Sequence, residues 1–158
     1  PVLSFTAEEV WKYMPKEDGM PESVMLQDWP QGYPEHFNQE LADKWSQLLD
    51  LRTSVQKALE LARQNKTIGH PLDASVTVYA EGAAFDALNA LGEEGLAKLV
   101  IVSEAHIVNG AAPAEAVKDE ETGVATVVAP SELEKCERCW IHRDTVGQDS
   151  EHPTLCHR

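Results

Sequence analysis

The sequence predicts an α+β protein built from three consecutive parts: the remnant of a helical bundle, a small α/β unit and a cysteine-bearing tail. Three observations predict this order. Up to about residue 70, apolar residues recur every three or four positions, as in an amphipathic helix; beyond it they alternate with polar residues. All three cysteines lie between positions 136 and 156. We therefore expect domains over residues 1–70, 71–130 and 131–158.

The size and charge of the chain limit its partners. Its 158 residues suffice for a hydrophobic core. The formal net charge of −14 disfavours general attraction to nucleic acid, so an RNA partner would have to be met by a local patch or by neighbouring protein. The sequence shows neither an apolar run long enough to span a bilayer nor a signal peptide. We therefore expect a cytoplasmic protein that makes no membrane contact.

The first predicted element is a short helix over residues 6–13. Thr6 is expected to cap it, and Glu9 is expected to reach back to complete a capping box. Phe5 and Val10 occupy the positions of a hydrophobic staple around that cap. Because this helix entry directly follows an apolar terminus, we expect that a preceding helix has been removed.

An extended segment over residues 23–26 and a long helix come next. The helix is expected to begin at about residue 34 or 38 and to end near Lys66, with Ile68-Gly69-His70 as its C-cap. Packing is the expected role of Trp11, Trp29 and Trp45. A single buried stripe is predicted for the apolar residues at helical spacing, which are Leu41, Trp45, Leu48, Leu51, Val55, Leu59 and Ala62.

The α/β unit is predicted from a change of period. Residues 74–80 alternate apolar and polar side chains, which is typical of a half-buried strand. Residues 85–91 read as a short helix that Gly92 and Gly95 end. Further strands are expected over residues 99–102, 105–108 and 124–128, with a hairpin or loop between 109 and 123.

The cysteines form the strongest pattern of the chain. Cys136 and Cys139 enclose two residues, and Cys156 follows after a polar loop. A Cys-x-x-Cys turn aims two sulfurs at one point, and a second turn completes the tetrahedron that zinc prefers. Free thiols or a redox pair are the alternative. The tail is too short for a core of its own, so metal would supply most of its folding free energy, on the order of 10 kcal/mol.

The residues of the tail do not decide which donor is the fourth zinc ligand. The chain ends two residues after Cys156, and a cysteine at the next position would complete the pattern. His142, His152 and His157 are alternatives, of which His157 would be strained by its position next to Cys156. The site is expected to be structural because thiolate-rich zinc sites are normally closed. No catalytic residues are predicted anywhere in the chain.

Trp140 and Arg138 are the candidate binding residues of the tail. Trp140 directly follows Cys139 and either covers the zinc turn or exposes an indole that stacks on an unpaired base. Arg138 lies inside the Cys-x-x-Cys turn and either contacts a phosphate or base edge or pairs with a nearby glutamate. Lys135 and Arg143 add to a local basic patch.

Segments in the right order over nearly the whole chain resemble the C-terminal part of bacterial isoleucyl-tRNA synthetase. The most specific is Cys136-Glu-Arg-Cys139-Trp140 with its ending at residues 152–158. The others are residues 3–11, 23–30, 51–63, 68–69 and 72–79. The resemblance implies that residues 1–70 end an α-helical anticodon-binding domain. The rest would then be a C-terminal extension that reaches the anticodon loop.

The resemblance also implies roles for single residues. Cys136, Cys139 and Cys156 are then ligands of a structural zinc, and Arg138 and Trp140 match positions expected to meet the tRNA(Ile) anticodon stem-loop. The parent enzyme, expected to be monomeric, would use ATP to couple isoleucine to its tRNA. Its catalytic domain carries two motifs that this sequence lacks, so the rest of the synthetase is an expected partner and the activity lies elsewhere.

Two other classes of protein remain as alternatives. The zinc spacing is shared with the finger of formamidopyrimidine-DNA glycosylases, which use an N-terminal proline followed by a glutamate. Here Pro1 is followed by Val2, and the acidic charge suits duplex DNA poorly. A zinc-stapled protein-interaction module would fit the acidity but not the matched helical segments.

Overall fold

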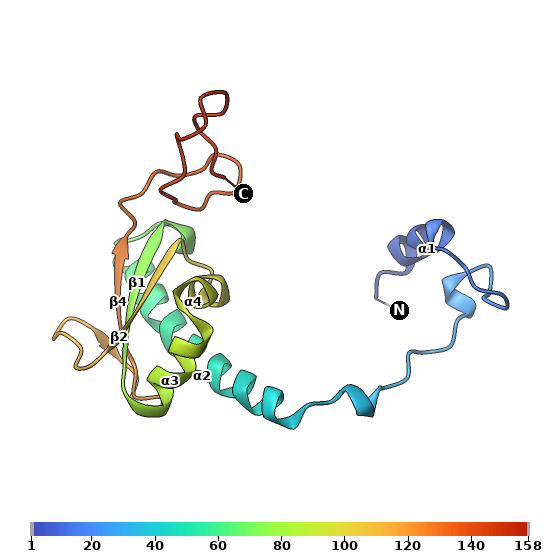
Figure 1. Ribbon diagram of the computed structural model, residues 1–158, viewed down its shortest axis with the longest axis horizontal. Helices are drawn as coiled ribbons and strands as arrows, with labels where there is room; N and C mark the ends of the chain where they lie inside the picture. Colours follow the sequence, from blue (N-terminus) through green and yellow to red (C-terminus); the bar gives the residue numbers. More distant parts are fainter. Residues whose placement is uncertain (1, 158) are drawn as a thin grey trace. The chain divides into compact units, whose positions relative to one another are not determined.

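The computed structural model describes residues 2–157 and contains two compact units, one ending at Asn38 and one beginning at Gln39. It confirms the predicted α+β class (Figure 1). None of the described helices is long and apolar enough to cross a membrane. The first unit contains α1 (Ser4–Tyr13) and the short 3-10 helices η1 (Val24–Leu26) and η2 (Pro34–His36). The elements of the second unit are α2 (Gln39–Gln64), η3 (Pro71–Asp73), β1 (Ala74–Ala80), α3 (Gly82–Leu91), α4 (Glu93–Val100), β2 (Glu104–Asn109), β3 (Val117–Lys118) and β4 (Ala125–Pro130).

The first unit is held together by contacts between α1 and the segment that follows it. The side chain of Trp11 is buried, and its indole N–H donates to the carbonyl of Pro21 at 3.0 Å. The carboxylate of Glu8 accepts hydrogen bonds from the Ser23 hydroxyl at 2.9 Å and from the Val24 amide at 3.1 Å. A hydrogen-bonded carboxylate therefore fixes η1 against α1.

The start of this unit differs from the prediction. Helix α1 already begins at Ser4, with Leu3 at the N-cap and no side-chain capping hydrogen bond, so the predicted capping box is wrong. Glu9 instead pairs with Lys12 one turn later at 2.9 Å. The staple is absent as well, because the side chain of Phe5 is 94% exposed. Two more helical residues before Thr6 place it inside the first turn, where it cannot cap.

The segment predicted to be extended forms the 3-10 helix η1 instead. Its hydrogen bonds run from the Leu26 amide to the Ser23 carbonyl and from the Gln27 amide to the Val24 carbonyl, both at 3.1 Å. The hydroxyl of Ser23 accepts from the Met25 amide, a local turn that favours 3-10 geometry over a strand. Trp29 is 72% exposed within its unit and Trp45 is 44% exposed, so their packing roles stay predictions.

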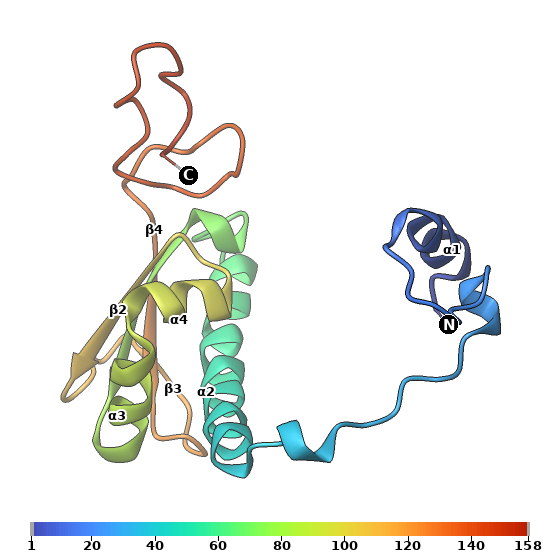
Figure 2. The same ribbon diagram turned by 45° about the vertical axis from the view of Figure 1, so that its right-hand side comes forward.

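The second unit is a mixed sheet with three helices on one face. The strand order is β2-β1-β4-β3; β1 pairs with β2 in parallel and with β4 antiparallel. Helices α2, α3 and α4 contact one another as well as the strands, which places them in one layer (Figure 2). Alternate residues of β1 face this layer and are buried: Ala74, Val76, Val78 and Ala80.

Helix α2 packs against this sheet. Five residues of the predicted stripe are buried: Leu48, Leu51, Val55, Leu59 and Ala62. Leu41 and Trp45 lie in the first turns of α2 and are exposed, so the buried stripe is shorter than predicted. The three-part division of the chain stays a prediction; the structure groups α2 with the strands rather than with residues 2–38.

The end of α2 shows why the predicted C-cap is misplaced. Lys66 adopts the left-handed conformation with φ of 61°. The Thr67 amide donates to the Ala62 carbonyl at 2.9 Å, and the Lys66 amide donates to Arg63 at 3.0 Å. These two bonds are the hydrogen-bond pattern of a Schellman motif, which ends the helix after Gln64 with Lys66, and not a glycine, in the left-handed position. His70 instead caps η3 by accepting from the Leu72 amide at 3.1 Å.

One predicted strand is a helix. Residues 99–102 were expected to be extended, but Leu99 and Val100 belong to α4, which Gly95 does not interrupt. A short apolar run does not distinguish a strand from a buried helix segment. Leu96 and Val100, four residues apart, bury one face of α4, and Lys98 pairs with Glu94 at 2.7 Å on the other. The predicted strands at 74–80, 105–108 and 124–128 are confirmed within one or two residues.

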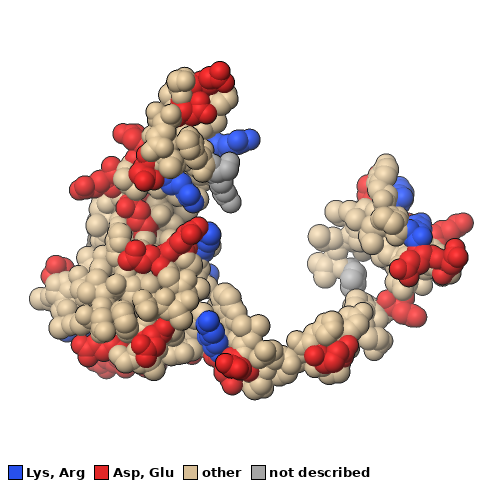
Figure 3. All heavy atoms as spheres, in the orientation of Figure 1, with Lys and Arg blue, Asp and Glu red and all other residues tan. Residues whose placement is uncertain are grey.

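The connection over residues 109–123 is anchored to α2. The ammonium group of Lys57 lies 2.7 Å from the carboxylate of Asp119, and the hydroxyls of Ser54 and Thr122 are 2.8 Å apart. The hydrogen bond from Lys57 is the main reason why the pKa of Asp119 is lowered to about 2. This anchoring holds the connection that contains β3 against α2. Acidic side chains are prominent over the visible surface, as the net charge predicts (Figure 3).

Candidate metal centre

The first cysteine turn forms the tip of a small hairpin. Lys135 and His142 form an antiparallel bridge at its base. The Cys136 amide donates to the Ile141 carbonyl at 3.0 Å, and the Trp140 amide donates back to the Cys136 carbonyl at 2.8 Å. Trp140 adopts the left-handed conformation with φ of 64°. The chain therefore reverses within the Cys-x-x-Cys turn and directs Cys136 and Cys139 to the same side.

The three cysteine sulfurs converge on one point. All three lie within 4.8 Å of one another, and the sulfurs of Cys139 and Cys156 are 3.7 Å apart. Ligands about 2.3 Å from a tetrahedral zinc are about 3.8 Å apart, so the spacing fits zinc. Cys136 is only 1% exposed, whereas Cys139 and Cys156 are partly exposed. The structure thus brings together the three residues that the spacing predicts as ligands.

Main-chain hydrogen bonds join the second turn to the first. The Glu137 amide donates to the Thr154 carbonyl at 3.2 Å, and the Cys156 amide donates to the sulfur of Cys136 at 3.4 Å. The Leu155 amide donates to the His152 carbonyl at 3.0 Å and closes the second turn. An N–H aimed at a sulfur stabilises its thiolate form, which is the form that binds metal.

The environment shifts the thiols in opposite directions. The pKa of Cys136 is lowered to about 6, chiefly by the backbone hydrogen bond from Cys139 and then by that from Cys156. Burial raises the pKa of Cys156 to about 11, and its contacts with the other two thiols add to this effect. The thiol of Cys136 therefore ionises more readily than that of Cys156. A divalent cation would relieve the crowding that opposes ionisation of Cys156.

None of the histidines within the described residues 2–157 joins this cluster. His142 is held elsewhere: its Nδ1 lies 2.6 Å from the Leu133 carbonyl, and its backbone amide donates to the Ser103 hydroxyl at 2.7 Å. His142, His152 and His157 therefore receive no support as the fourth ligand. The described residues offer three thiols, and the fourth coordination position is left to another donor.

Trp140 and Arg138 are exposed residues of the knuckle formed by residues 135–142. The side chain of Trp140 is 60% exposed, and that of Arg138 is exposed beside the hollow between the cysteines. A non-glycine residue with positive φ costs about 1–2 kcal/mol, and a bulky side chain there is unusual. An exposed indole on a strained backbone fits a role outside the knuckle, and the choice between a lid on the zinc turn and a base-stacking surface stays a prediction.

Asp73 fixes the knuckle to the sheet, and no sequence pattern indicates this role. Its carboxylate accepts from the Lys135 ammonium at 2.8 Å and from the His70 amide at 2.9 Å, and it lies 3.5 Å from His142 Nε2. The hydrogen bond from Lys135 is the main reason why the pKa of Asp73 is lowered. Lys135 therefore serves as an anchor as well as a positive charge beside the knuckle.

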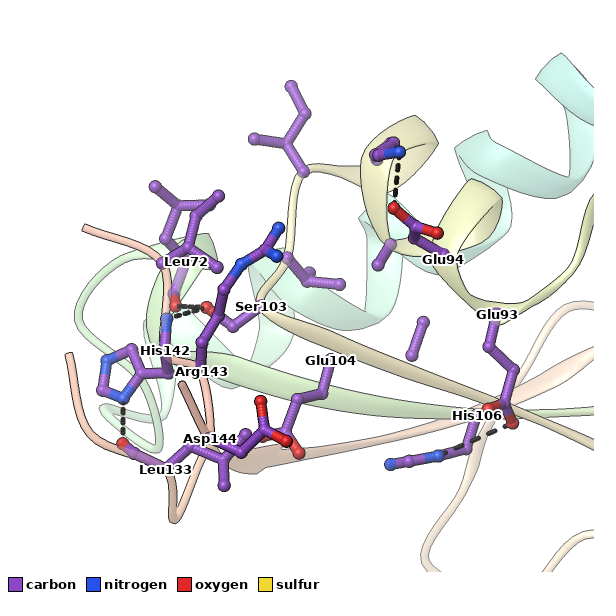
Figure 4. A pocket seen from close by; sticks show the side chains of 16 residues that line it. Leu72, Glu93, Glu94, Ser103, Glu104, His106, Leu133, His142, Arg143 and Asp144 are labelled. Atoms are coloured by element: carbon purple, nitrogen blue, oxygen red, sulfur yellow. Dashed lines mark hydrogen bonds and ion pairs between the residues drawn. The ribbon is translucent and has the colours of Figure 1, made fainter. Parts of the chain in front are cut away.

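Ser103 provides a second contact between the knuckle and the sheet. Its hydroxyl donates to the Leu72 carbonyl and accepts from the His142 amide, so it joins three segments (Figure 4). Ser131 adds a hydrogen bond to the carboxylate of Glu104. Residues 72–73 and 103–104 are far from the tail in sequence, and no spacing pattern connects them to it. Only the parallel pairing of β1 with β2 brings them to the same end of the sheet.

Replacing Asp73 with asparagine is expected to loosen the knuckle without releasing metal. The change removes the charge that Lys135 binds, and each lost hydrogen bond to a charged group costs on the order of 1–3 kcal/mol. Amide exchange at residues 133–143 should become faster, while zinc content and exchange at β1 stay unchanged. Asp86→Asn, an exposed carboxylate on α3, is the matched control. If amide exchange at residues 133–143 is unchanged in the Asp73 variant, the contact with Asp73 does not make the knuckle more rigid.

Comparisons with known proteins agree with this geometry. Residues 1–78 match the family described as anticodon-binding domain of tRNA ligase, and residues 134–158 match the zinc finger found in FPG and IleRS. The whole chain aligns with isoleucine–tRNA ligases of Moorella thermoacetica, at 44% identity over 161 residues, and of Syntrophomonas wolfei, at 46% over 160. The corresponding protein of Shewanella piezotolerans is 44% identical over 161 residues. The chain spans 17% of the length of each of these relatives.

These matches decide between the classes of protein that the sequence left open. The zinc-finger family includes both glycosylases and synthetases, but the match over residues 1–78 and the alignment of the whole chain favour the synthetase. The family match and the three-thiol cluster together support structural zinc in the tail. The matches support this chain as a fragment of an isoleucyl-tRNA synthetase, with an anticodon-binding match over residues 1–78 and a zinc-finger match over residues 134–158.

Proposed function

We propose that this chain is the part of an isoleucine–tRNA ligase that binds the anticodon stem-loop of tRNA(Ile). Arg138 and Trp140 are the residues that meet the RNA. The observation that carries this proposal is the exposed, left-handed Trp140 next to the cysteine cluster. An indole held at a fixed angle on a rigid turn is suited to stack on an unpaired base.

Cys136, Cys139 and Cys156 are the proposed zinc ligands. When bound, zinc supplies a rigid structural centre in place of a hydrophobic core, which the tail lacks. The protein's own residues position the binding surface. The Cys136–Trp140 turn directs the indole outward, and Asp73 and Ser103 hold the base of the hairpin on the sheet. The position of the Trp140 indole is therefore tied to that of the sheet.

Charge limits how the RNA is bound. The ammonium group of Lys135 is engaged by Asp73 at 2.8 Å, which leaves Arg138 and Arg143, among the described residues 135–143, to contact phosphates. A chain of net charge −14 gains little from general attraction to phosphates. Affinity should therefore come from stacking and from a small number of phosphate contacts.

Titration of the zinc-loaded chain with the anticodon stem-loop at several salt concentrations tests this function. Each neutralised phosphate contributes about −0.7 to −0.9 to the slope of log affinity against log salt, so we expect a slope no steeper than about −2. The control is a DNA duplex of equal length, which should bind less tightly. Tighter binding to the duplex would favour the DNA-repair alternative, and absence of stem-loop binding would contradict an independent RNA site.

The ligation reaction would be carried out by other parts of the longer polypeptide. In such a protein, ATP and isoleucine bind in the catalytic domain, and this chain contributes no catalytic residue. We propose a cytoplasmic location and a monomeric ligase, in which the remainder of the synthetase is the covalent partner of this segment.

A further inference from the structure

Nε2 of His142 is the one buried side-chain nitrogen or oxygen of residues 2–157 that lacks a hydrogen-bond partner. The side chain of His142 is 15% exposed and lies where the hairpin meets the sheet (Figure 4). Because Nε2 is closed off from water, leaving it unpaired is unfavourable. The charge state of the ring decides whether this atom has a partner.

The other ring nitrogen fixes the position of one proton. Nδ1 of His142 lies 2.6 Å from the carbonyl oxygen of Leu133 (Figure 4). A carbonyl accepts hydrogen bonds but cannot donate them, so Nδ1 carries a proton. In a neutral ring, Nε2 then carries a lone pair instead of a proton. Only the protonated ring has an N–H at both positions.

Nε2 faces the carboxylate of Asp73, whose Oδ1 is 3.5 Å away. A lone pair on Nε2 would be repelled by this oxygen, whereas an N–H of a protonated ring would be attracted to it. The pKa of Asp73 is lowered chiefly by Lys135, and the hydrogen bond from His142 adds to this effect. Such coupling is reciprocal, so the ionised carboxylate of Asp73 favours the protonated form of His142.

The other charged groups around His142 are predominantly acidic. On the hairpin, Lys135 lies 2.8 Å from the same Oδ1 and opposes a second cation, but its side chain is 44% exposed and therefore screened by water. On the other side of Asp73, His70 donates its backbone amide to Oδ2. The groove beside His142 is lined by four carboxylates, two cations and one further histidine: Glu93, Glu94, Glu104 and Asp144, Lys98 and Arg143, and His106.

We propose that protonation of His142 strengthens the attachment of the knuckle to the sheet. In the protonated form one ring N–H is bonded to Leu133 and the other faces Asp73, whereas in the neutral form the second contact is repulsive. Histidine changes its charge between about pH 5 and 8. The attachment is therefore stronger at the acid side of this range and weakens as the pH rises through it. This inference concerns the knuckle itself and does not depend on RNA binding.

NMR of the zinc-loaded chain between pH 6.5 and 8.5 tests the proposal. We expect the ring nitrogens of His142 to be both protonated at pH 6.5 and to lose one proton within this range. Amide protection at residues 133–143, corrected for the intrinsic exchange rate at each pH, should fall about tenfold, as expected for one lost hydrogen bond to a charged group. Protection of β1 and the zinc content should stay constant.

Two variants provide the comparison. His142→Gln cannot take up a proton, so its protection at residues 133–143 should be low and independent of pH. His106→Gln is the matched control, because it removes a histidine of the same groove that lies 3.6 Å from Glu93 and not against Asp73, and it should keep the pH dependence.

A neutral His142 ring at pH 6.5 would overturn the proposal, and this signal of the unmodified chain can be measured even if a variant fails to fold. Persistence of the pH dependence in His142→Gln would overturn it as well. Loosening toward acid pH together with loss of zinc would assign the dependence to the thiols and would also contradict it. Failure of RNA binding would leave all of these readings unaffected.

Discussion

Cys136→Ser is expected to abolish stoichiometric zinc binding and to unfold residues 131–157 while the sheet stays folded. Cys136 is the buried member of the cluster, and its sulfur also accepts the hydrogen bond from the Cys156 amide that joins the two turns. Binding of a structural zinc contributes on the order of 10 kcal/mol to folding. No other buried apolar cluster in the described part of the tail replaces that contribution, because the buried core lies in α2–α4 and the sheet.

The test measures the zinc content of the variant and its amide exchange, both in the knuckle and in the sheet. The variant should contain less than stoichiometric zinc and exchange rapidly over the knuckle, yet retain slow exchange at β1 and β4. His152→Ala is the control, since it changes a metal-binding residue type in the same tail outside the cluster. If His152→Ala lost zinc as well, a histidine would belong to the ligand set. Full zinc retention in Cys136→Ser would contradict the three-thiol site.

Substitution of Trp140 is expected to separate stability from RNA binding. Trp140→Gly removes the indole and also relieves a left-handed backbone that costs about 1–2 kcal/mol for other residues. Zinc affinity should therefore rise, by about fivefold for each 1 kcal/mol relieved. Stem-loop binding should fall by about 1–3 kcal/mol, the amount that base stacking on an aromatic ring contributes.

Trp140→Ala is the matched variant because it removes the indole but keeps a Cβ in the strained conformation. It should lose stem-loop affinity to the same extent without the gain in zinc affinity, and Trp140→Phe should retain part of the stacking. In a full-length ligase, these variants should slow charging of tRNA(Ile) and leave isoleucine–ATP exchange near normal. A parallel loss of zinc and RNA affinity in Trp140→Gly would instead assign Trp140 a packing role.

The α/β region shows how far periodicity alone carries a prediction. Strand β1 was predicted with its bounds because alternation over seven residues has no helical counterpart. Helix α4 was missed because Leu99-Val-Ile-Val102 is apolar throughout, and such a run suits a strand or a buried helix equally. Its helical state depends on Leu96 and Val100 packing beneath it, which are tertiary contacts.

The metal centre was predictable for a different reason. A Cys-x-x-Cys turn fixes two ligands by local geometry, and zinc chemistry accounts for the third cysteine, so spacing alone indicated Cys136, Cys139 and Cys156. The sequence also indicated Arg138 and Trp140 by their adjacency to these ligands. It could not indicate that Trp140 is left-handed and exposed, because that depends on how the hairpin closes.

The sequence by itself determined the order of helical, α/β and cysteine-bearing segments and the three thiols, because each depends on residues close together in the chain. Only the tertiary structure decided that Asp73 and Ser103 hold the knuckle and that Nε2 of His142 faces Asp73. These contacts join residues that are far apart in the chain: Ser103 and His142 are 39 positions apart, and Asp73 and Lys135 are 62. The pairing of strands brings these residues together in space. The preference of single residues for helix or strand does not indicate which strands pair.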